Sequence, residues 1–298
     1  MERDNLLRYR PVIDDWDTFL AAAQTPLPHV VRANTLKIAP SSLQQRLIAS
    51  GVGVASYDWT EELFEITEPP GRRIEHWLGL YYAQEAVQTL PVLALDPQPE
   101  ERILDLCAAP GGKATFIAAR MQNRGTLVAN EPKGRRQMSL LANINRLGVL
   151  NAMITAYQGE SFPMGAKFDR ILVDAPCSAE GTLRKVPSLQ HGASMGSIAR
   201  LARLQKRLIV RAFDLLAPEG HLVYSTCTFA PEENEAVVAH LLQERAARVL
   251  PTRIPVETST GLTEWLDETF PAEIQRCVRV YPHHLDSGGG FVALIARA

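Results

Sequence analysis

Cysteine is scarce in this chain, and its spacing excludes two kinds of site. The 298 residues contain four cysteines, Cys107, Cys177, Cys227 and Cys277, and no two of them form a C-x-x-C pair. Structural zinc sites need cysteines that are close in sequence, and disulfide scaffolds need many of them. We therefore expect reduced thiols in a cytoplasmic protein that binds no metal.

Long apolar segments and a strong net charge are also lacking. No hydrophobic run approaches the ~20 residues of a membrane helix, so we expect no membrane association. The N-terminal stretch MERDNLLRYRPVIDDW is too polar for a signal peptide. The formal net charge is −2, so a nucleic-acid site has to be a local patch. The composition, 46% hydrophobic and 21% charged, is that of a soluble globular protein, and we expect a monomer.

Two glycine-rich nucleotide motifs are absent from the stretch that could carry one. Residues 102–113, RILDLCAAPGGK, read as a buried strand that includes Asp105, a loop of small residues and a helix start. A phosphate loop would need glycine at Cys107 and serine or threonine at Ala114, and G-x-G-x-x-G does not occur. Small side chains and the amides of a helix N-terminus still let a ligand approach the backbone closely. An ordinary strand–turn–helix junction is the alternative.

A carboxylate after the next strand favours a cofactor site over an ordinary junction. Residues 125–131, GTLVANE, read as a second buried strand that ends at Glu131, twenty residues after Gly111. An acidic residue there suits a bidentate hydrogen bond to a ribose. The loop and the acid together predict a nucleoside cofactor without a phosphate tail, and S-adenosylmethionine is the leading candidate.

The chain divides into a small α+β unit and a larger α/β domain. The elements expected in the first unit are a helix capped by Asp15, strands at 30–38 and 62–67, and a helix at 41–51 capped by Ser41 or Ser42. Residues 73–95 carry apolar residues at helical spacing and lead to a break, Asp96-Pro97-Gln98-Pro99. We place the boundary there, which gives domains at 1–95 and 96–298.

Strands and helices alternate from residue 101, which predicts a mainly parallel sheet with helices on both faces. The expected strands are 102–107, 125–131, 151–156, 168–174, 220–226 and 291–296, and the expected helices are 112–121, 133–147, 198–217 and 232–246. Sites in such sheets lie at the carboxyl ends of the strands. Segments 107–112, 174–177 and 225–228 fall at these ends and are expected to converge.

Two cysteines follow central strands on the expected cofactor side. Asp174 ends one strand and Ala-Pro-Cys177 follows it, while Cys227 follows the strand that ends in Ser225 and Thr226. Pro231 is typical of a first helical turn, so Cys227 would precede a helix N-terminus, whose partial positive charge favours a thiolate. A lone cysteine is usually a small buried hydrophobe. Two cysteines at strand ends instead predict a thiol-dependent site.

Together these motifs resemble the Sun/Nop-type RNA 5-methylcytosine methyltransferases, a family that includes bacterial RsmB and RsmF. The matching segments, in order, are VVRANTLK, YYAQEAVQTLPV, LDLCAAPGGK, ILVDAPCSAEGT, YSTCTFAPEEN and PHHLDSGGGFVALIA. The resemblance covers nearly the whole chain. It implies a Rossmann-like α/β methyltransferase sheet behind a small N-terminal α+β domain that contacts RNA, with S-adenosylmethionine as cofactor and rRNA or tRNA as partner.

The resemblance also implies roles for individual residues. Cys227 would be the nucleophile, Cys177 would assist product release, and Asp174 would bond the cytosine ring at nitrogen 3. The residues implied to bind the cofactor are Cys107, Ala108, Ala109, Pro110, Gly111, Gly112, Lys113, Glu131, Gln158 and Asp174. Gln158 stands where the family commonly has aspartate, but its carbonyl could still accept from the adenine amino group. We also expect no appended RNA-binding domain like the one carried by several relatives.

In the implied mechanism, the Cys227 thiolate adds to carbon 6 of a flipped-out cytosine, and carbon 5 then attacks the sulfonium methyl group. A base removes the carbon-5 proton and Cys227 leaves, a step suited to Cys177. Amino-group methylation is one alternative, but it typically uses an N/D-P-P-Y loop instead of DAPC. The other is an RNA-binding assembly factor that has lost catalysis, which the intact cysteines, Glu131 and glycine loop disfavour.

Basic residues near the expected cleft are candidates for RNA contact. Arg184 and Lys185 come just beyond the DAPC loop, and Arg32 and Lys37 lie in the N-terminal unit. A further set lines one face of the helix at 198–217: Arg200, Arg203, Arg207 and Arg211. That pattern is more typical of the solvated face of an amphipathic helix than of a phosphate track.

Overall fold

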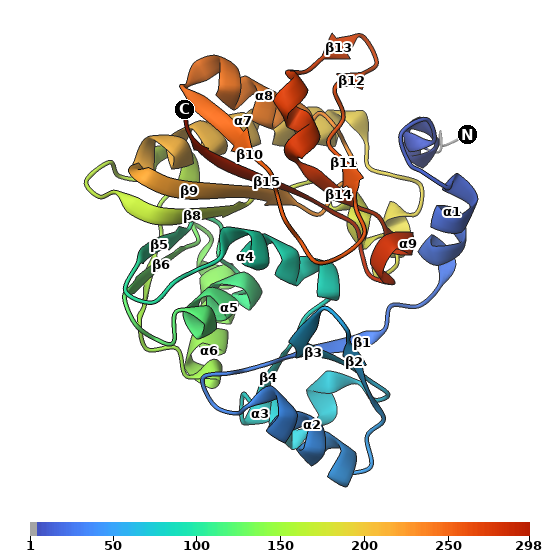
Figure 1. Cartoon of the computed structure of the whole chain (residues 1–298), viewed down its shortest axis with the longest axis vertical. Coiled ribbons are helices and arrows are strands. Elements are labelled where there is room, and N and C mark those ends of the chain that lie inside the picture. The colour runs from blue at the N-terminus through green and yellow to red at the C-terminus, as the bar shows by residue number, and fades with distance from the viewer. Residues whose placement is uncertain (1–4) are drawn as a thin grey trace.

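A computed structural model describes residues 5–298 of the chain. A small unit, drawn in blue and cyan, lies below a larger one in Figure 1. The described part contains a four-stranded sheet, a nine-stranded sheet and a two-stranded hairpin. None of its helices is both long enough and apolar enough to cross a membrane.

The small unit is an antiparallel sheet with helices on one side. Its strand order is β2-β3-β1-β4. The strands are β1 (His29–Ala33), β2 (Val54–Tyr57), β3 (Thr60–Ile66) and β4 (Tyr81–Ala83), and the helices are α2 (Pro40–Ala49) and α3 (Ile74–Trp77). Leu43 and Leu47 of α2 pack on Val31, Phe64 and Tyr81 of the sheet. This burial is the hydrophobic core that holds the unit together.

Three expectations for this unit are wrong in detail. The strand expected at 30–38 ends at Ala33, because Asn34 turns the chain and bonds the carbonyl oxygens of Gly79 and Leu147. Neither expected serine caps α2, since Ala39 is its N-cap and Pro40 its first residue. Residues 73–95 are not one helix but α3, β4, a short 3-10 helix at Ala86–Thr89 and α4 (Leu90–Leu95).

Gly79 explains the break in residues 73–95. Its φ is +70°, and a Cβ there would lie 2.0 Å from the carbonyl oxygen of Arg146. Only glycine tolerates both conditions. The apolar periodicity could not reveal this close approach, because Arg146 is distant in sequence.

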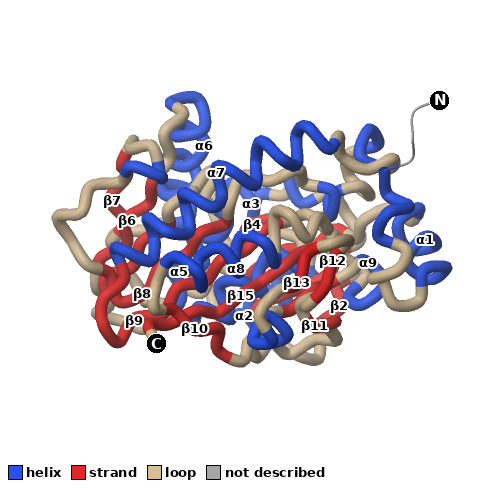
Figure 2. Tube along the Cα trace, turned by 90° about the horizontal axis from the view of Figure 1, so that it is seen from above, coloured by secondary structure: helices blue, strands red, loops and turns tan. Residues whose placement is uncertain are grey.

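The N-terminal segment packs on the larger unit. Asp15 caps α1 (Trp16–Gln24), as expected, by accepting a hydrogen bond from the amide of Thr18. Tyr9 and Phe19 join a buried aromatic cluster with Phe229, Tyr281 and Trp265. Residues 5–24 therefore lie beside the C-terminal part of the chain, and α1 is at the opposite end of the molecule from β7 in Figure 2. The domain boundary at residue 95 stays a prediction.

The large sheet has a parallel half and an antiparallel half. Its order is β11-β14-β15-β9-β8-β5-β6-β7, and β10 also pairs with β15. The parallel strands are β5 (Arg102–Asp105), β6 (Thr126–Asn130), β7 (Ala152–Thr155), β8 (Phe168–Asp174) and β9 (Leu216–Thr226). The antiparallel strands are β10 (Ala247–Leu250), β11 (Ser259–Thr260), β14 (Val278–Val280) and β15 (Gly290–Arg297), while β12 (Glu264–Trp265) and β13 (Glu268–Thr269) form the hairpin. The sheet is thus mixed and not mainly parallel.

Helices cover both faces of this sheet, as expected. One face packs on α4, α5 (Gly112–Arg120) and α6 (Gly134–Leu147), and the other on α7 (Met195–Leu215) and α8 (Glu235–Glu244). The short α9 (Pro282–Leu285) contacts α1. With these layers in place, the carboxyl ends of β5, β8 and β9 face the small unit.

Candidate active site

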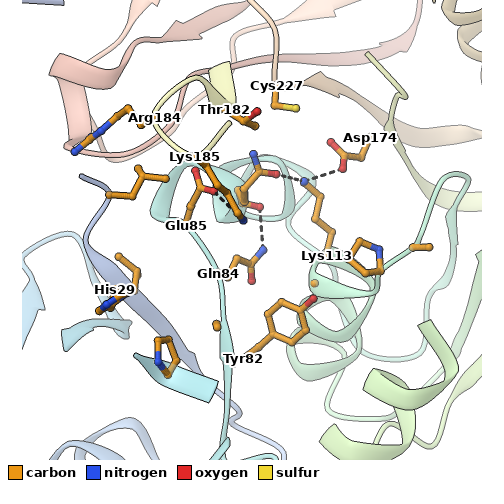
Figure 3. Close-up of a pocket in the computed structure, with 18 of the residues that line it drawn as sticks. His29, Tyr82, Gln84, Glu85, Lys113, Asp174, Thr182, Arg184, Lys185 and Cys227 are labelled. Carbon is orange, nitrogen blue, oxygen red and sulfur yellow. Dashed lines mark hydrogen bonds and ion pairs between the residues drawn. The ribbon is translucent and has the colours of Figure 1, made fainter. Parts of the chain in front are cut away.

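A cleft of about 610 Å³ lies between the small unit and the carboxyl ends of β5, β8 and β9 (Figure 3). Its walls include residues of all three expected segments: Cys107 to Pro110, Gly112, Asp174 and Cys227. The small unit contributes residues such as His29, Tyr82 and Glu85. The structure therefore brings together segments that are far apart in sequence. Within residues 5–298 there is no cluster of three His, Cys, Asp or Glu side chains that could hold a metal.

Two positions in the 107–113 loop require glycine. Gly111 has φ +110°, which L side chains rarely adopt, and α5 begins at the next residue. A Cβ on Gly112 would lie 3.0 Å from the ring of Tyr82. Gly112 and the small residues Ala108, Ala109 and Pro110 line the cleft, and their contact with a cofactor stays a prediction.

Lys113 points from α5 into the cleft and pairs with Asp174. Its Nζ lies 2.8 Å from Asp174 Oδ2 and 2.5 Å from Gln88 Oε1. Burial lowers the pKa of Lys113, but the carboxylate of Asp174 and a charge on Cys227 more than offset this and raise it overall. Ser225 Oγ donates to the other Asp174 oxygen at 3.0 Å. The ammonium group thus lies between an aspartate and a cysteine.

Asp105 is a functional candidate that the sequence analysis did not select. It ends β5, lines the cleft and is only 1% exposed, and neither carboxylate oxygen has a hydrogen-bond partner within the described residues. Burial and the charge of Asp174 raise the pKa of Asp105 to about 7, while the charge of Lys113 and the nearby amide of Cys107, which does not meet hydrogen-bond geometry, oppose the rise. A buried polar group without a partner costs stability. The only sequence signal was a carboxylate inside an apolar strand.

The two site cysteines touch each other. Their Sγ atoms are 3.4 Å apart, and the amide of Cys227 also points at Cys177 Sγ at 3.4 Å. Cys227 lines the cleft, whereas Cys177 is not among its lining residues. The hydrogen bond with Cys227 and burial raise the pKa of Cys177 well above its ordinary value. Cys177 is therefore a neutral thiol against the sulfur that faces the cleft.

The expected helix N-terminus behind Cys227 is displaced. Residues 231–234 form a turn, and α8 begins only at Glu235. The helix therefore starts eight residues after Cys227 and not five, so its partial charge, which acts within the first turn, falls away from the sulfur. Lys113 supplies the positive charge near this thiol instead.

Glu131 and Gln158 lie outside the cleft-lining set. Glu131 is 1% exposed; its Oε1 accepts from the amide of Lys133 at 2.9 Å, and its Oε2 pairs with Arg136 at 3.0 Å. Gln158 is exposed in the loop after β7. Arg136 also donates to the carbonyl oxygen of Ala109 and so links Glu131 to the loop that borders the cleft.

Two of the four residues expected to contact RNA are buried in structural roles. Arg32 is 2% exposed and bonds Gln84, Thr115 and the Gly112 carbonyl oxygen. Arg184 has a fully buried side chain that bonds Asp286 and the carbonyl oxygens of Thr25, Pro26 and Ser287. Internal acceptors occupy both guanidinium groups, although Arg184 lines the cleft, and contact of these two arginines with RNA stays a prediction.

The two expected lysines are more accessible. Lys37 is exposed, although its ammonium group bonds the carbonyl oxygens of Leu78 and Arg146. Lys185 lines the cleft with a side chain that is 68% exposed, and its nearest acid is Glu85 at 3.7 Å (Figure 3). Lys185 is the one of the four whose surroundings best fit contact with a phosphate.

The comparisons with known proteins agree on one family. A family model described as 16S rRNA methyltransferase RsmB/F matches residues 92–296, and the N-terminal domain of 16S rRNA methyltransferase RsmF matches residues 7–86. The tRNA (cytosine(49)-C(5))-methyltransferase of Pyrococcus abyssi is 39% identical over 290 residues, which cover 96% of this chain and 93% of that protein.

Two further comparisons extend this result. The human 28S rRNA (cytosine(4447)-C(5))-methyltransferase is 38% identical over 284 residues; the match covers 92% of this chain but only 35% of the human protein. The crystal structure of a methyltransferase homologue from Pyrococcus horikoshii has a TM-score of 0.84 at 35% identity, covering 94% of this chain and 90% of that one. The expected resemblance, fold class and methyltransferase activity are confirmed. The chain belongs to the RsmB/F family of methyltransferases, which use S-adenosylmethionine as cofactor.

Proposed function

We propose that this protein forms 5-methylcytosine in rRNA or tRNA through a covalent bond between Cys227 and the cytosine ring. The observation that carries the proposal is the pair of thiols 3.4 Å apart, of which one lines the cleft beside the Lys113–Asp174 ion pair. Relatives named for cytosine-C5 methylation of tRNA and rRNA support it. The catalytically silent assembly factor is the alternative.

The lining of the cleft fits S-adenosylmethionine, which supplies an activated methyl group when bound. The unpartnered carboxylate of Asp105 suits the α-ammonium group of the cofactor. The thin loop around Gly112 lets adenosine approach the backbone. Glu131 would hold the ribose, in exchange for part of its bonding to Arg136, and Gln158 would accept from the adenine amino group.

Addition needs a thiolate and a place for charge on the ring. Lys113 interacts electrostatically with Cys227, so its ammonium group is a positive charge close to the sulfur that adds to carbon 6. Electron density then moves toward nitrogen 3 of the cytosine. The proton held between Lys113 Nζ and Asp174 Oδ2 can be shared with that nitrogen. Carbon 5 becomes enamine-like, so it could attack the sulfonium methyl group of a bound cofactor, whose sulfur would leave as a neutral thioether.

Release reverses the first bond. A base takes the carbon-5 proton, and the electrons of that C–H bond restore the double bond between carbons 5 and 6. The bond between carbon 6 and Cys227 sulfur breaks, and its electron pair stays on the sulfur. Cys177 lies where its thiol can donate a hydrogen bond to the departing sulfur. Because burial and the contact with Cys227 keep Cys177 protonated, it suits this step better than nucleophilic attack.

The remaining parts of the proposal concern RNA and setting. We propose that the N-terminal region up to residue 95 contacts RNA and that Lys185 meets a phosphate at the mouth of the cleft. The target base must leave its stack to reach Cys227. We further propose that the enzyme acts as a cytoplasmic monomer without a metal.

The function is tested by methyl transfer and by sequencing. Purified protein with labelled S-adenosylmethionine should transfer methyl groups to rRNA or tRNA from a strain that lacks the gene. Bisulfite sequencing of total RNA should show one or more cytosines that are converted in that strain but resist conversion in the wild type. Normal protection of every site, together with RNA binding but no transfer, would favour the assembly factor.

Glu131→Ala is expected to weaken cofactor binding markedly. Loss of a charged acceptor for the ribose hydroxyls costs about 1.5–3 kcal/mol. Calorimetry measures the change, and Arg135→Leu is the control, because Arg135 is an exposed residue of the first turn of α6. Unchanged affinity in Glu131→Ala would remove Glu131 from the site.

Two substitutions of Gln158 should differ in their effect on cofactor affinity. Gln158→Asp restores a carboxylate acceptor for the adenine amino group, so binding should be kept or tightened. Gln158→Leu removes the acceptor and should weaken binding. The dissociation constants of the three proteins decide the matter; equal values would show that Gln158 does not face adenine.

A further inference from the structure

Two buried side chains that the mechanism above does not use hold the loop that carries Cys177. Gln205 Nε2, from α7, donates to the carbonyl oxygen of Pro176 at 2.9 Å and to Glu233 Oε2 at 2.7 Å. Glu233 Oε2 also accepts from the amide of Ser178 at 3.1 Å. The carbonyl group before Cys177 and the amide group after it are therefore bridged by one pair of side chains.

This arrangement is costly for the fold. Gln205 and Glu233 are both 0% exposed, and Gln205 Oε1 is buried with no hydrogen-bond partner among the described residues. Within residues 5–298, no lysine, arginine or histidine forms an ion pair with Glu233. Apolar side chains of similar size would commonly give a more stable core at such a place. A gain in stability therefore does not explain the pair.

The bridge acts on a contact that is sensitive to small movements. Cys177 Sγ meets the sulfur and the amide of Cys227 at 3.4 Å each, so a shift of the loop would break both contacts. A second link ties the same loop to the Cys227 segment, since Ser178 Oγ and Thr228 Oγ1 are 2.7 Å apart. The position of the Cys177 thiol therefore depends on the peptide groups that Gln205 and Glu233 hold.

Electrostatics supports the same relation. The charge of Glu233 adds to the hydrogen bond with Cys227, to burial and to the charge of Cys227 in raising the pKa of the Cys177 thiol. Burial raises the pKa of Glu233 itself to about 7, against the effect of its bonds to Ser178 and Gln205. The other titratable groups that interact with Glu233 are Glu180 and Tyr224, and both are acids.

We propose that Gln205 and Glu233 are positioning residues that keep the Cys177 thiol against the sulfur of Cys227 while the methylated RNA is released. They act through the peptide groups on either side of Cys177 and touch neither RNA nor cofactor. The inference rests on the proposed roles of the two cysteines. It extends the release machinery from the loop itself to α7 and to the turn before α8.

The first test is accumulation of the protein–RNA adduct. Gln205→Leu and Glu233→Gln should retain transfer of the first methyl group but slow turnover by about 10- to 100-fold, because a misplaced group loses orientation. The kcat and the KM for RNA should fall together while kcat/KM stays unchanged, because only a step after methyl transfer is slowed, and an adduct should persist on denaturing gels. Ile209→Ala, a buried apolar change one turn from Gln205 in α7, is the control for lost stability and should show no adduct. Normal turnover without adduct in both variants would overturn the proposal.

The second test needs no RNA, so it separates this inference from the proposed function. In a Cys227→Ser background, iodoacetamide labelling of Cys177 is followed at pH 8 by mass spectrometry. Adding Glu233→Gln should speed the labelling several-fold, because it removes a negative charge and loosens the loop. Buried Cys277 serves as the internal reference. An unchanged Cys177 rate would overturn the inference even if the enzyme methylates RNA, whereas a faster rate in a protein that methylates no RNA would refute only the proposed function.

Discussion

Cys227→Ala abolishes both methyl transfer and the covalent complex if the proposed mechanism is correct. The substitution removes the sulfur that lines the cleft beside the Lys113–Asp174 pair. Cys107 also lines the cleft but cannot replace it, because burial raises the pKa of Cys107 well above its ordinary value. An expected loss of at least several thousand-fold would be of the order seen when a nucleophile is removed.

Cys177→Ala should give the opposite phenotype. Addition to the ring and methyl transfer remain possible, but release slows because nothing donates to the departing sulfur. A protein–RNA adduct should therefore accumulate and survive denaturing electrophoresis. The double variant should show none, since no nucleophile remains to form the bond. This dependence is the non-additivity expected of residues that act as a unit.

Labelled RNA on denaturing gels and methyl counts per enzyme measure both effects. Cys277→Ala is the matched control, because Cys277 is buried in the core around β14 and far in sequence from both site loops. A stable adduct with Cys227→Ala and none with Cys177→Ala would reverse the two roles. Unchanged activity in both variants would show that the chemistry is not thiol-based.

The parallel half of the large sheet was predictable because each strand is a short apolar run before a helix. The expected strand at 168–174 has the bounds of β8, and β5, β6 and β7 end within two residues of expectation. The antiparallel half was largely missed. β11, for example, is two residues long, too short for any periodicity to show. Its pairing depends on a tertiary contact with β14.

Within the site, the sequence identified residues that belong to recognisable motifs. It did not identify residues whose role depends on whether they are buried. The convergence of Cys107, Asp174 and Cys227 followed from strand order alone. By contrast, the burial of Arg32 and Arg184 depends on Gln84 and Asp286, which are distant in sequence. A basic residue near a loop looks the same in sequence whether its charge faces solvent or an internal acceptor.

Asp105→Asn is expected to weaken cofactor binding and to stabilise the free protein. In the proposed site the carboxylate is the partner of the cofactor's ammonium group, and loss of one member of a buried charge pair costs about 2–5 kcal/mol of binding. Without cofactor, however, the carboxylate of Asp105 is buried and has no hydrogen-bond partner within the described residues. Asparagine has nearly the same shape and carries no charge to desolvate.

The pH dependence distinguishes this role from general damage to the site. The pKa of Asp105 is about 7 in the folded protein, above the ordinary value of 3.8 that an aspartate has in an unfolded chain. Protonated Asp105 therefore contributes its full share of folding stability at a pH below the pKa of the unfolded chain. That contribution is lost as pH rises through about 7. Asp105→Asn should remove that loss, so the variant gains most in melting temperature at pH 8 and least at pH 5.

Cofactor affinity should follow the opposite trend in the wild-type protein. Below pH 7 the Asp105 carboxyl is protonated in the free enzyme, and binding of the ammonium group has to expel that proton. Affinity should fall by up to tenfold per pH unit there and level off above pH 7, whereas Asp105→Asn should bind weakly at every pH. Titration calorimetry from pH 5.5 to 8.5 measures both curves. A wild-type affinity that is flat across pH 7, or an asparagine variant that binds normally, would show that Asp105 does not hold the ammonium group.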